Sequence, residues 1–457
     1  MKEVTAQAFR AYDIRGLVDV DFDLEWVHLL GLACGTTFKK EGLHTAVVGH
    51  DCRESSPEYA KALIQGISEA GVSVLFIGMV PTPFVYYAVK QYDTRAGVMV
   101  TASHNPSEYN GFKIWRGEST LYNDGIDDLR RLMLSHDFTS GKGTVESCDI
   151  FPIYCDDVAD RVALQRPLKV VVDGGNGAGG KYCVAMLERL GAEIVPLFCE
   201  PDGAFPNHHP DPVVEANMEQ LKQKVLAEKA DLGIGLDGDG DRIGAVDETG
   251  RLLFGDELLA LFSREVLLRK PGASILGDVK CSHRLFRDIA DHGGHGEMCA
   301  TGHSFMKAKM RELGAELGGE MSGHMFFADR WYGFDDALYA SARLLEILAA
   351  SPEPFSTRLK WPPSFVTPEL HTPCHDAVKN SVMAKAAAYF RERYDILETD
   401  GVRLVFPDGW GLVRASNTQP VLVLRFEAES DSRLNEIRNI VETPLAGWIT
   451  QAQETLS

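Results

Sequence analysis

The chain has 457 residues, which at about 150 residues per domain predicts three or four domains. Its 46 basic and 66 acidic residues give a net charge of −20, so the surface should repel nucleic acid and anionic membranes, and neither is expected as a partner. The 9 cysteines are odd in number and form no C-x-x-C pair, which argues against a disulfide framework and a zinc knuckle and favours a reducing cytoplasm.

The N-terminal part of the chain predicts neither a secretory signal nor a membrane span. Residues 1–16 lack the apolar core that a signal peptide needs. Residues 70–89 contain no charge over about the length that crosses a bilayer, but Pro81 and Pro83 interrupt them. The two halves instead predict a strand before the prolines and an amphipathic helix after them.

A unit of three strands recurs three times in the first three quarters of the chain, where strand and helix patterns alternate as in α/β domains. Its first strand begins near Thr45, Lys169 and Ala273. In open α/β sheets the ligand loops lie at the carboxyl ends of the strands. We therefore expect one shared cleft for the loops that follow the third strand of each copy, which are TASHNP (101–106), DGDGDR (237–242) and GEMSGH (319–324).

The last quarter of the chain has a different pattern. After the proline-rich residues 361–368 it predicts one helix, a β-meander and a closing helix, as in a separate lid-type domain.

The DGDGDR loop places Asp237, Asp239 and Asp241 at alternate positions between glycines. Three carboxylates so close together repel one another, and a hard cation such as Mg²⁺ or Ca²⁺ would offset that repulsion. A solvated acidic turn is the alternative. An EF-hand is rejected, because Arg242 stands at the position where its sharp turn needs glycine and because strands flank the loop.

The other two loops offer a nucleophile and a sugar-binding pair. Ser103 and His104 lie side by side at a strand end, and a serine hydroxyl becomes a good nucleophile only with help from a base or an electrophile. Glu320 and Ser322 are suited to adjacent sugar hydroxyls. A simple turn and a polar surface loop are the respective alternatives.

A candidate anion site lies in the meander, where Arg414 is followed by Ser416, Asn417 and Thr418. An ordinary β-turn is the alternative. The glycine-rich residues 175–180 mimic a dinucleotide-binding fingerprint, but the equivalent turns of the other two copies lack the glycines, so NAD binding is not expected.

Eight segments in order along the chain resemble the α-D-phosphohexomutase superfamily, and within it the bacterial phosphomannomutases/phosphoglucomutases: AYDIRG (11–16), TASHNP, NGFKI (110–114), NHHPDP (207–212), DGDGDR, GEMSGH, RWYGFDD (330–336) and RASNTQP (414–420). The resemblance implies three tandem related α/β domains with mixed sheets plus a smaller C-terminal α+β domain around one central cleft. The expected boundaries are 1–149, 150–251, 252–363 and 364–457.

The resemblance also implies reversible phosphoryl transfer between the 1- and 6-hydroxyls of hexose phosphates. Phosphorylated Ser103 would donate its phosphoryl group, and a hexose 1,6-bisphosphate would be the intermediate and activator. Mg²⁺ would be held by the Ser103 phosphate and by Asp237, Asp239 and Asp241. Proton transfer would fall to Lys113 and His104, with Arg15 and Arg242 near the transferred group. The substrate would be bound by Tyr12, Lys280, His303, Glu320, Ser322, Arg414, Ser416, Asn417 and Thr418.

Several further expectations follow from this resemblance. Lys113, crowded by arginine and metal, should have a lowered pKa. Gln419 replaces a glutamate usual in the family, and we expect it to be tolerated. Mannose and glucose phosphates are favoured over glucosamine phosphates as substrates, without a ranking between the two. A monomer is expected, with a dimer as the alternative. The rival functions are a phosphatase that uses the same serine and metal, and a metal-binding scaffold without catalysis.

Overall fold

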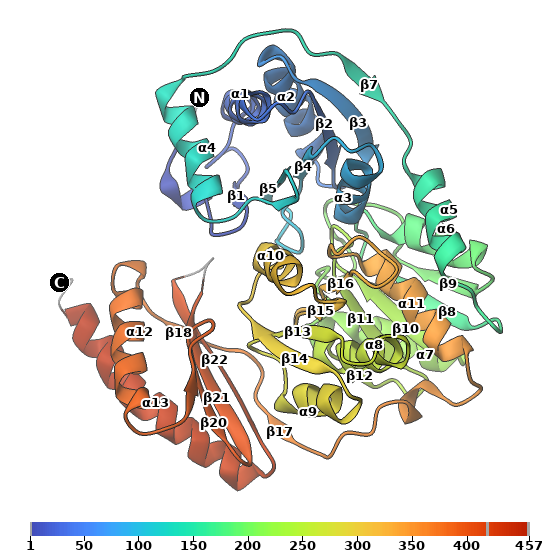
Figure 1. The fold of residues 1–457 in the computed structure, drawn as a ribbon, viewed down its shortest axis with the longest axis vertical. Coiled ribbons are helices and arrows are strands. Elements are labelled where there is room, and N and C mark those ends of the chain that lie inside the picture. The colour runs from blue at the N-terminus through green and yellow to red at the C-terminus, as the bar shows by residue number, and fades with distance from the viewer. Residues whose placement is uncertain (1, 417–419, 455–457) are drawn as a thin grey trace.

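The computed structural model describes residues 2–416 and 420–454. The first domain is built on a seven-stranded sheet with the order β1-β5-β4-β2-β3-β7, in which β6 pairs with β5 (Figure 1). Its elements are η1 (Ala6–Ala8), β1 (Ile14–Leu17), α1 (Leu24–Lys40), β2 (Thr45–His50), α2 (Ser56–Glu69), β3 (Ser73–Met79), α3 (Thr82–Gln91), β4 (Ala96–Val100), β5 (Tyr109–Arg116), β6 (Ser119–Thr120), α4 (Asp124–Ser135) and β7 (Val145–Ser147).

The second domain has a five-stranded sheet with the order β12-β11-β10-β8-β9. Its elements are α5 (Phe151–Arg161), β8 (Lys169–Asp173), α6 (Gly180–Arg189), β9 (Glu193–Leu197), η2 (Glu215–Met218), α7 (Glu219–Glu228), β10 (Leu232–Leu236), β11 (Ile243–Asp247) and β12 (Leu252–Leu253).

The third domain has a four-stranded sheet with the order β14-β13-β15-β16. Its elements are α8 (Gly255–Arg269), β13 (Ser274–Asp278), α9 (His283–Asp291), β14 (His295–Cys299), α10 (His303–Leu313), β15 (Leu317–Gly319), β16 (Met325–Phe327), α11 (Ala337–Ala349) and η3 (Phe355–Thr357).

These three domains repeat one topology. In each of these sheets three strands are parallel, and a fourth strand, the next in the chain, pairs antiparallel with the third. The spatial orders, with the antiparallel strand first, are β5-β4-β2-β3, β11-β10-β8-β9 and β16-β15-β13-β14. The third strand of each copy, β4, β10 or β15, is buried along its whole length, as expected for a strand with covered faces. The predicted fold class, with its tandem related domains and mixed sheets, is confirmed.

The fourth domain is an antiparallel sheet covered by two helices. The strand order is β17-β22-β21-β20-β19, and β18 also pairs with β22. Apolar side chains of α12 and α13 pack on this sheet in a core of its own. The elements are β17 (Phe365–Val366), β18 (Leu370–Pro373), α12 (Asp376–Arg391), β19 (Ile396–Leu397), β20 (Val402–Phe406), β21 (Gly409–Ala415), β22 (Val421–Ala428) and α13 (Asp431–Glu454).

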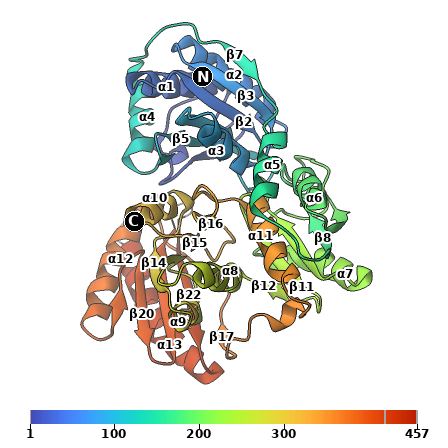
Figure 2. The same ribbon diagram turned by 45° about the vertical axis from the view of Figure 1, so that its right-hand side comes forward.

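One hydrophobic core runs through the first three domains. Its centre is aromatic: Trp331 stacks on Tyr339 with ring centroids 4.2 Å apart and lies 5.7 Å from Tyr87 of α3. The same segment places Asp336 at the N-cap of α11, where its side chain also accepts hydrogen bonds from Tyr154 and Trp331. Figure 2 shows α11 beside the second-domain sheet, so residues 330–336 join three domains.

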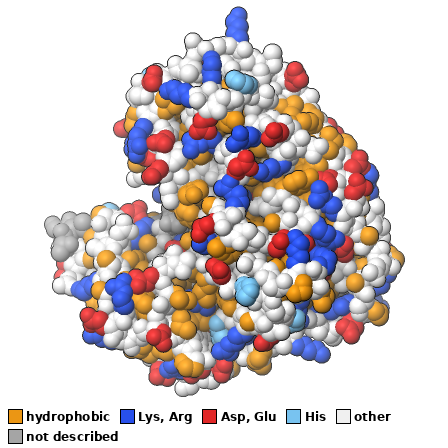
Figure 3. All heavy atoms as spheres, in the orientation of Figure 1, with side chains coloured by type: hydrophobic (Ala, Val, Ile, Leu, Met, Phe, Trp, Pro, Cys, Tyr) orange, Lys and Arg blue, Asp and Glu red, His pale blue; other side chains and the backbone are white. Residues whose placement is uncertain are grey.

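A deep notch separates the first domain from the fourth in the space-filling view (Figure 3). The fourth domain instead lies against the third, through contacts described below. The uncharged residues 70–89 form β3 and the start of α3, as the sequence predicts. Over the described part of the chain, no helix combines the length and apolar composition needed to cross a bilayer.

Candidate active site

Three loops from three domains meet at one point. Ser103 follows β4, and Asp237 follows β10. The Ser103 hydroxyl donates a hydrogen bond to Asp237 Oδ2 at 2.9 Å. His324, after β15, lies with its Nε2 3.2 Å from Asp241 Oδ1. All four side chains are buried. The strand-end loops of the three repeats therefore form a common site.

Asp237, Asp239 and Asp241, which we call the acidic triad, are fully buried, and one oxygen from each lies within 4.8 Å of the others. Burial raises the pKa of Asp237 well above its ordinary value, and the two neighbouring carboxylates raise it further. Asp239 Oδ1 has no hydrogen-bond partner among the described residues. A hard, oxygen-preferring cation such as Mg²⁺ fits this set of donors.

The close approach of two loops requires glycine in the acidic segment. A Cβ atom on Gly238 would lie 2.5 Å from the carbonyl oxygen of Ser103, closer than real Cβ contacts allow. Ser103 itself has a φ of 53°, a left-handed conformation that is uncommon outside glycine and typical of constrained functional loops. The glycines between the aspartates therefore also allow the backbone of the serine loop to contact the acidic segment.

The serine loop is held from behind by Arg53, a residue to which the sequence analysis assigned no role. Its guanidinium is fully buried and donates to the carbonyl oxygens of Ser103 at 2.8 Å and Asn105 at 2.6 Å. Asp51 Oδ2 accepts from Arg53 Nε at 3.0 Å. Arg53 lies in the polar loop that follows β2, the first strand of the first repeat. This position was the only feature of the sequence that could have indicated its role.

Two arginines flank Ser103 and His104. Arg15 donates to Asn105 Oδ1 at 2.8 Å, and Arg242 Nε lies 3.8 Å from Asp237 Oδ2. His104 Nδ1 is 3.1 Å from Ser103 Oγ. Burial holds the pKa of His104 well below its usual range, and the charges of Arg242 and Arg15 lower it further. His104 is therefore neutral near pH 7, and its Nδ1 can accept the serine proton once the hydroxyl turns away from Asp237.

Lys113 of β5 joins the serine domain to the acidic triad. Its Nζ donates to Asp239 at 2.7 Å and to Asp241. Burial disfavours the charged lysine, but the two carboxylates outweigh that cost and raise the pKa of Lys113 above its ordinary value. The prediction of a lowered pKa was wrong, because the near neighbours of this ammonium are carboxylates rather than arginines.

The third loop is organised around Glu320. Its carboxylate accepts hydrogen bonds from the Gly302 amide at 2.7 Å and from the Ser322 hydroxyl at 3.0 Å, and it contacts His324 Nδ1 at 2.9 Å. Burial opposes ionisation, yet hydrogen bonding and charge from His324 lower the pKa of Glu320 to about 2. Asp241 and Glu320 likewise raise the pKa of His324 to about 9 against the effect of its burial. The loop presents a charged acceptor with a hydroxyl beside it.

The predicted phosphate-binding residues lie where the third and fourth domains meet. Arg414 donates to Asp400 Oδ2 at 2.8 Å, and the same oxygen accepts from the backbone amide of Thr301 at 3.1 Å. Lys280 donates to Glu369 at 2.7 Å across the same boundary. Ser416 is buried directly after β21, and the predicted residues Asn417, Thr418 and Gln419 lie outside the described residues.

Tyr12 and His303 lie beside the third loop. Their rings pack edge to face with centroids 5.4 Å apart, and the His303 ring lies 6.1 Å from that of His324. Burial raises the pKa of Tyr12. Both side chains thus face the third loop.

Four family models match the chain in order. They describe domains I, II and III and the C-terminal domain of phosphoglucomutase/phosphomannomutase and cover residues 6–138, 152–250, 254–365 and 373–443. The chain belongs to the phosphoglucomutase/phosphomannomutase family.

Relatives of this phosphoglucomutase/phosphomannomutase family member match along their whole length. A phosphomannomutase/phosphoglucomutase of Pseudomonas aeruginosa is 47% identical over 448 residues, with 96% of each chain covered. A phosphoglucomutase of Neisseria gonorrhoeae is 41% identical, again over 96% of each chain. A crystal structure of a family protein from Burkholderia thailandensis has a TM-score of 0.92 and 41% identity over 98% of each chain. The predicted phosphohexomutase identity is confirmed.

In this family member, His324 is a residue of the candidate site that the sequence analysis did not single out. It closes the GEMSGH motif, and only the fold reveals that it touches both Asp241 and Glu320. Its position directly after a glycine in a loop already marked for sugar binding was the available signal.

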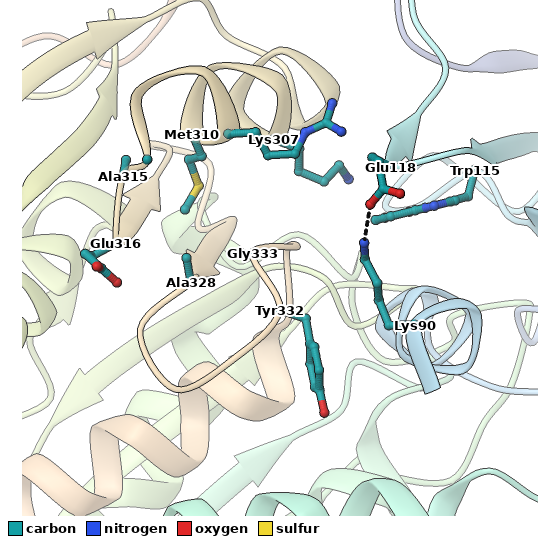
Figure 4. Close-up of a pocket in the computed structure, with 12 residues that line it drawn as sticks. Lys90, Trp115, Glu118, Lys307, Met310, Ala315, Glu316, Ala328, Tyr332 and Gly333 are labelled. Carbon is teal, nitrogen blue, oxygen red and sulfur yellow. Dashed lines mark hydrogen bonds and ion pairs between the residues drawn. The ribbon is translucent and has the colours of Figure 1, made fainter. Parts of the chain in front are cut away.

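A separate cavity of about 250 Å³ opens between the first and third domains. Figure 4 shows Lys90, Trp115 and Glu118 on one side of it and Lys307, Met310 and Tyr332 on the other. On its wall Lys90 donates a hydrogen bond to Glu118 at 3.1 Å. None of the predicted site residues lines it.

Proposed function

We propose that this protein interconverts the 1- and 6-phosphates of mannose, glucose or both, through phosphorylated Ser103 and a hexose 1,6-bisphosphate intermediate. The observation that supports this most directly is the 2.9 Å contact between the Ser103 hydroxyl and the acidic triad, which brings a nucleophile to a candidate cation site. Membership of the family supports the substrate class. The bisphosphate is proposed to turn over within the cleft, so that its second phosphate reaches Ser103.

Each half-reaction forms one oxygen–phosphorus bond and breaks another. When Ser103 attacks the bisphosphate, its hydroxyl proton passes to neutral His104, and Lys113 donates a proton to the departing sugar oxygen. In the opposite direction the two residues exchange roles. Arg15 and Arg242 stabilise charge on the transferred phosphoryl group. Mg²⁺, held by the acidic triad and the Ser103 phosphate, would neutralise charge on the phosphoryl oxygens.

We propose that the protein binds the substrate through its sugar hydroxyls and through the phosphate that does not react. Glu320 and Ser322 would bind the 3- and 4-hydroxyls of the sugar. The 2-hydroxyl, where mannose and glucose differ, would then contribute little to binding. The non-reacting phosphate would be bound by Tyr12, Lys280, His303, Arg414, Ser416, Asn417 and Thr418. Arg414 pairs with Asp400 and Lys280 with Glu369, which supports this, because an incoming phosphate can replace those carboxylates.

The test combines mass analysis with a mutase assay. Peptide mapping of the purified protein should find phosphate on Ser103, and glucose 1-phosphate or mannose 1-phosphate should yield the 6-phosphate with catalytic bisphosphate and Mg²⁺. Inorganic phosphate released as fast as the isomer forms would favour the phosphatase instead. Absence of both the phosphoserine and the isomer would favour the non-catalytic scaffold.

A cytoplasmic location is part of the same proposal. All 9 cysteines are unbridged, and 7 of them are buried, which suits a reducing compartment.

A further inference from the structure

The RWYGFDD segment reaches helix α10 through a buried ion pair. Lys307 Nζ donates to Asp335 Oδ1 at 2.6 Å, and both side chains are buried. The same ammonium lies 3.0 Å from Nδ1 of His303, one helical turn earlier on α10. It also sits 4.4 Å from the centre of the Tyr86 ring, a cation–π distance. Three contacts therefore fix the position of the lysine.

The contact with Lys307 determines where His303 carries its proton. Burial and the charge of Lys113 lower the pKa of Lys307, whereas the ion pair with Asp335 opposes that shift and favours the ammonium form. An ammonium has three donors and no acceptor, so in this form Nδ1 of His303 accepts the hydrogen bond. Asp335 Oδ2, at 3.7 Å, is too distant to take a proton from Nδ1 instead. Burial, with the charges of Lys307 and Lys113, holds the pKa of His303 well below its usual range. The ring is thus neutral, with its hydrogen on Nε2.

The Nε2 atom of His303 is a buried donor without a hydrogen-bond partner among the described residues. The rings that surround it belong to Tyr12 and His324, both at the candidate active site. A buried N–H left without an acceptor is unfavourable, so such a donor points to a ligand atom that completes it.

We propose that Lys307, held in place by Asp335, is a positioning residue that fixes His303 as the Nε2–H tautomer, so that Nε2 donates to an oxygen of the bound hexose phosphate. This rests on the proposed function for the identity of the ligand. The tautomer itself depends only on the protein, so the two parts can be tested separately.

The tautomer is measured by ¹⁵N NMR of histidine-labelled wild-type protein, with the His303 signals assigned from their loss in His303→Asn. We expect the pattern of a neutral ring with Nδ1 unprotonated and Nε2 protonated near pH 7. A proton on Nδ1, or a charged ring, would overturn the proposal whether or not the protein is a mutase.

The functional part is tested with the double variant Lys307→Met/Asp335→Asn, which removes both charges together and so avoids an unpaired buried carboxylate. We expect a fall in kcat/KM of about 10- to 100-fold, by analogy with the loss of a partner that orients a metal-bound histidine, together with mixed His303 tautomers. Lys309→Met, on the same helix but at the surface, should match wild type. Full activity with an unchanged tautomer in the double variant would refute the positioning role.

A failure of the proposed function looks different. If wild-type protein converts no hexose phosphate while His303 shows the Nε2–H pattern, the substrate assignment falls and the Lys307 assignment stands. If the double variant does not fold, the wild-type spectrum still decides the tautomer, and a proton on Nδ1 there overturns the proposal.

Discussion

Single residues at this site owe their chemistry to neighbours from other domains. Ser103 gains a carboxylate partner 134 positions away, and Lys113 is ionised by carboxylates more than 120 positions away. His104 is next to Ser103 in sequence, yet its neutrality arises from burial and from Arg15 and Arg242. Protonation at this site is therefore a property of the assembled domains.

Ser103→Ala should reduce turnover by on the order of 10³-fold or more, since the variant has no oxygen to carry the phosphoryl group. Substrate binding should change little, because the residues proposed to bind the sugar hydroxyls and the non-reacting phosphate are unchanged. A coupled mutase assay and calorimetry measure the two effects. Ser107→Ala, an exposed serine of the same loop, is the matched control. Unchanged turnover in Ser103→Ala would refute the nucleophile assignment.

Arg53→Lys should lower kcat about 100-fold, the cost of misplacing a catalytic group by about 1 Å. A lysine cannot reproduce the planar fork that binds several carbonyl oxygens of the serine loop. Steady-state kinetics provide the measurement, and Arg131→Lys, an exposed arginine of the same domain, should behave as wild type. Equal activity of both variants would show that the loop holds its shape without Arg53.

At the scale of elements, the site depends on where strands end and on how closely their loops approach. β4, β10 and β15 are equivalent strands of a repeated sheet, so their loops emerge at equivalent edges. Close backbone contact also limits the residue type where helices α1 and α2 pack. A Cβ on Gly31 of α1 would lie 2.3 Å from the Leu63 carbonyl oxygen of α2. Glycines in this chain thus permit close approach of backbone segments.

Gly238→Ala should disrupt the site while the domains stay folded, because the new Cβ would push against the Ser103 carbonyl. We expect kcat to fall at least about 10-fold, with weaker Mg²⁺ activation, as the serine moves off the triad. Kinetics at varied Mg²⁺ and circular dichroism test this. Gly447→Ala, where the new methyl meets nothing, is the control. Normal Mg²⁺ dependence in Gly238→Ala would contradict the argument.

At the scale of the whole molecule, three domains share one core and the fourth has its own. The fourth meets the third through polar pairs, including Lys280 with Glu369 and Asp400 with the Thr301 amide. Arg403 adds a buried link by donating to the carbonyl oxygen of Val279 at 2.5 Å. A small apolar cluster of Val279 with Trp410 and Leu412 adds to these polar contacts. A mixed boundary of this kind can rearrange more easily than a large shared apolar core.

Arg414→Ala tests the contribution of the fourth domain. We expect a loss of about 2–4 kcal/mol of transition-state stabilisation, the scale for a removed charged donor. The loss should be similar for mannose and glucose phosphates, because Arg414 is proposed to bind phosphate rather than sugar. Values of kcat/KM for both substrates provide the readout. Near wild-type values would exclude Arg414 from the phosphate grip.

The repeat, the strand-end loops and the acidic triad could be predicted from the residues alone, because strand periodicity and short-range motifs are local properties of the chain. The charged state of Lys113, the contacts of Arg53 with the serine loop and the orientation of His303 by Lys307 emerge only in the folded domains. Those outcomes are sums of burial and electrostatic interactions over residues distant in sequence, and their sign depends on which groups the folded domains bring within a few ångströms.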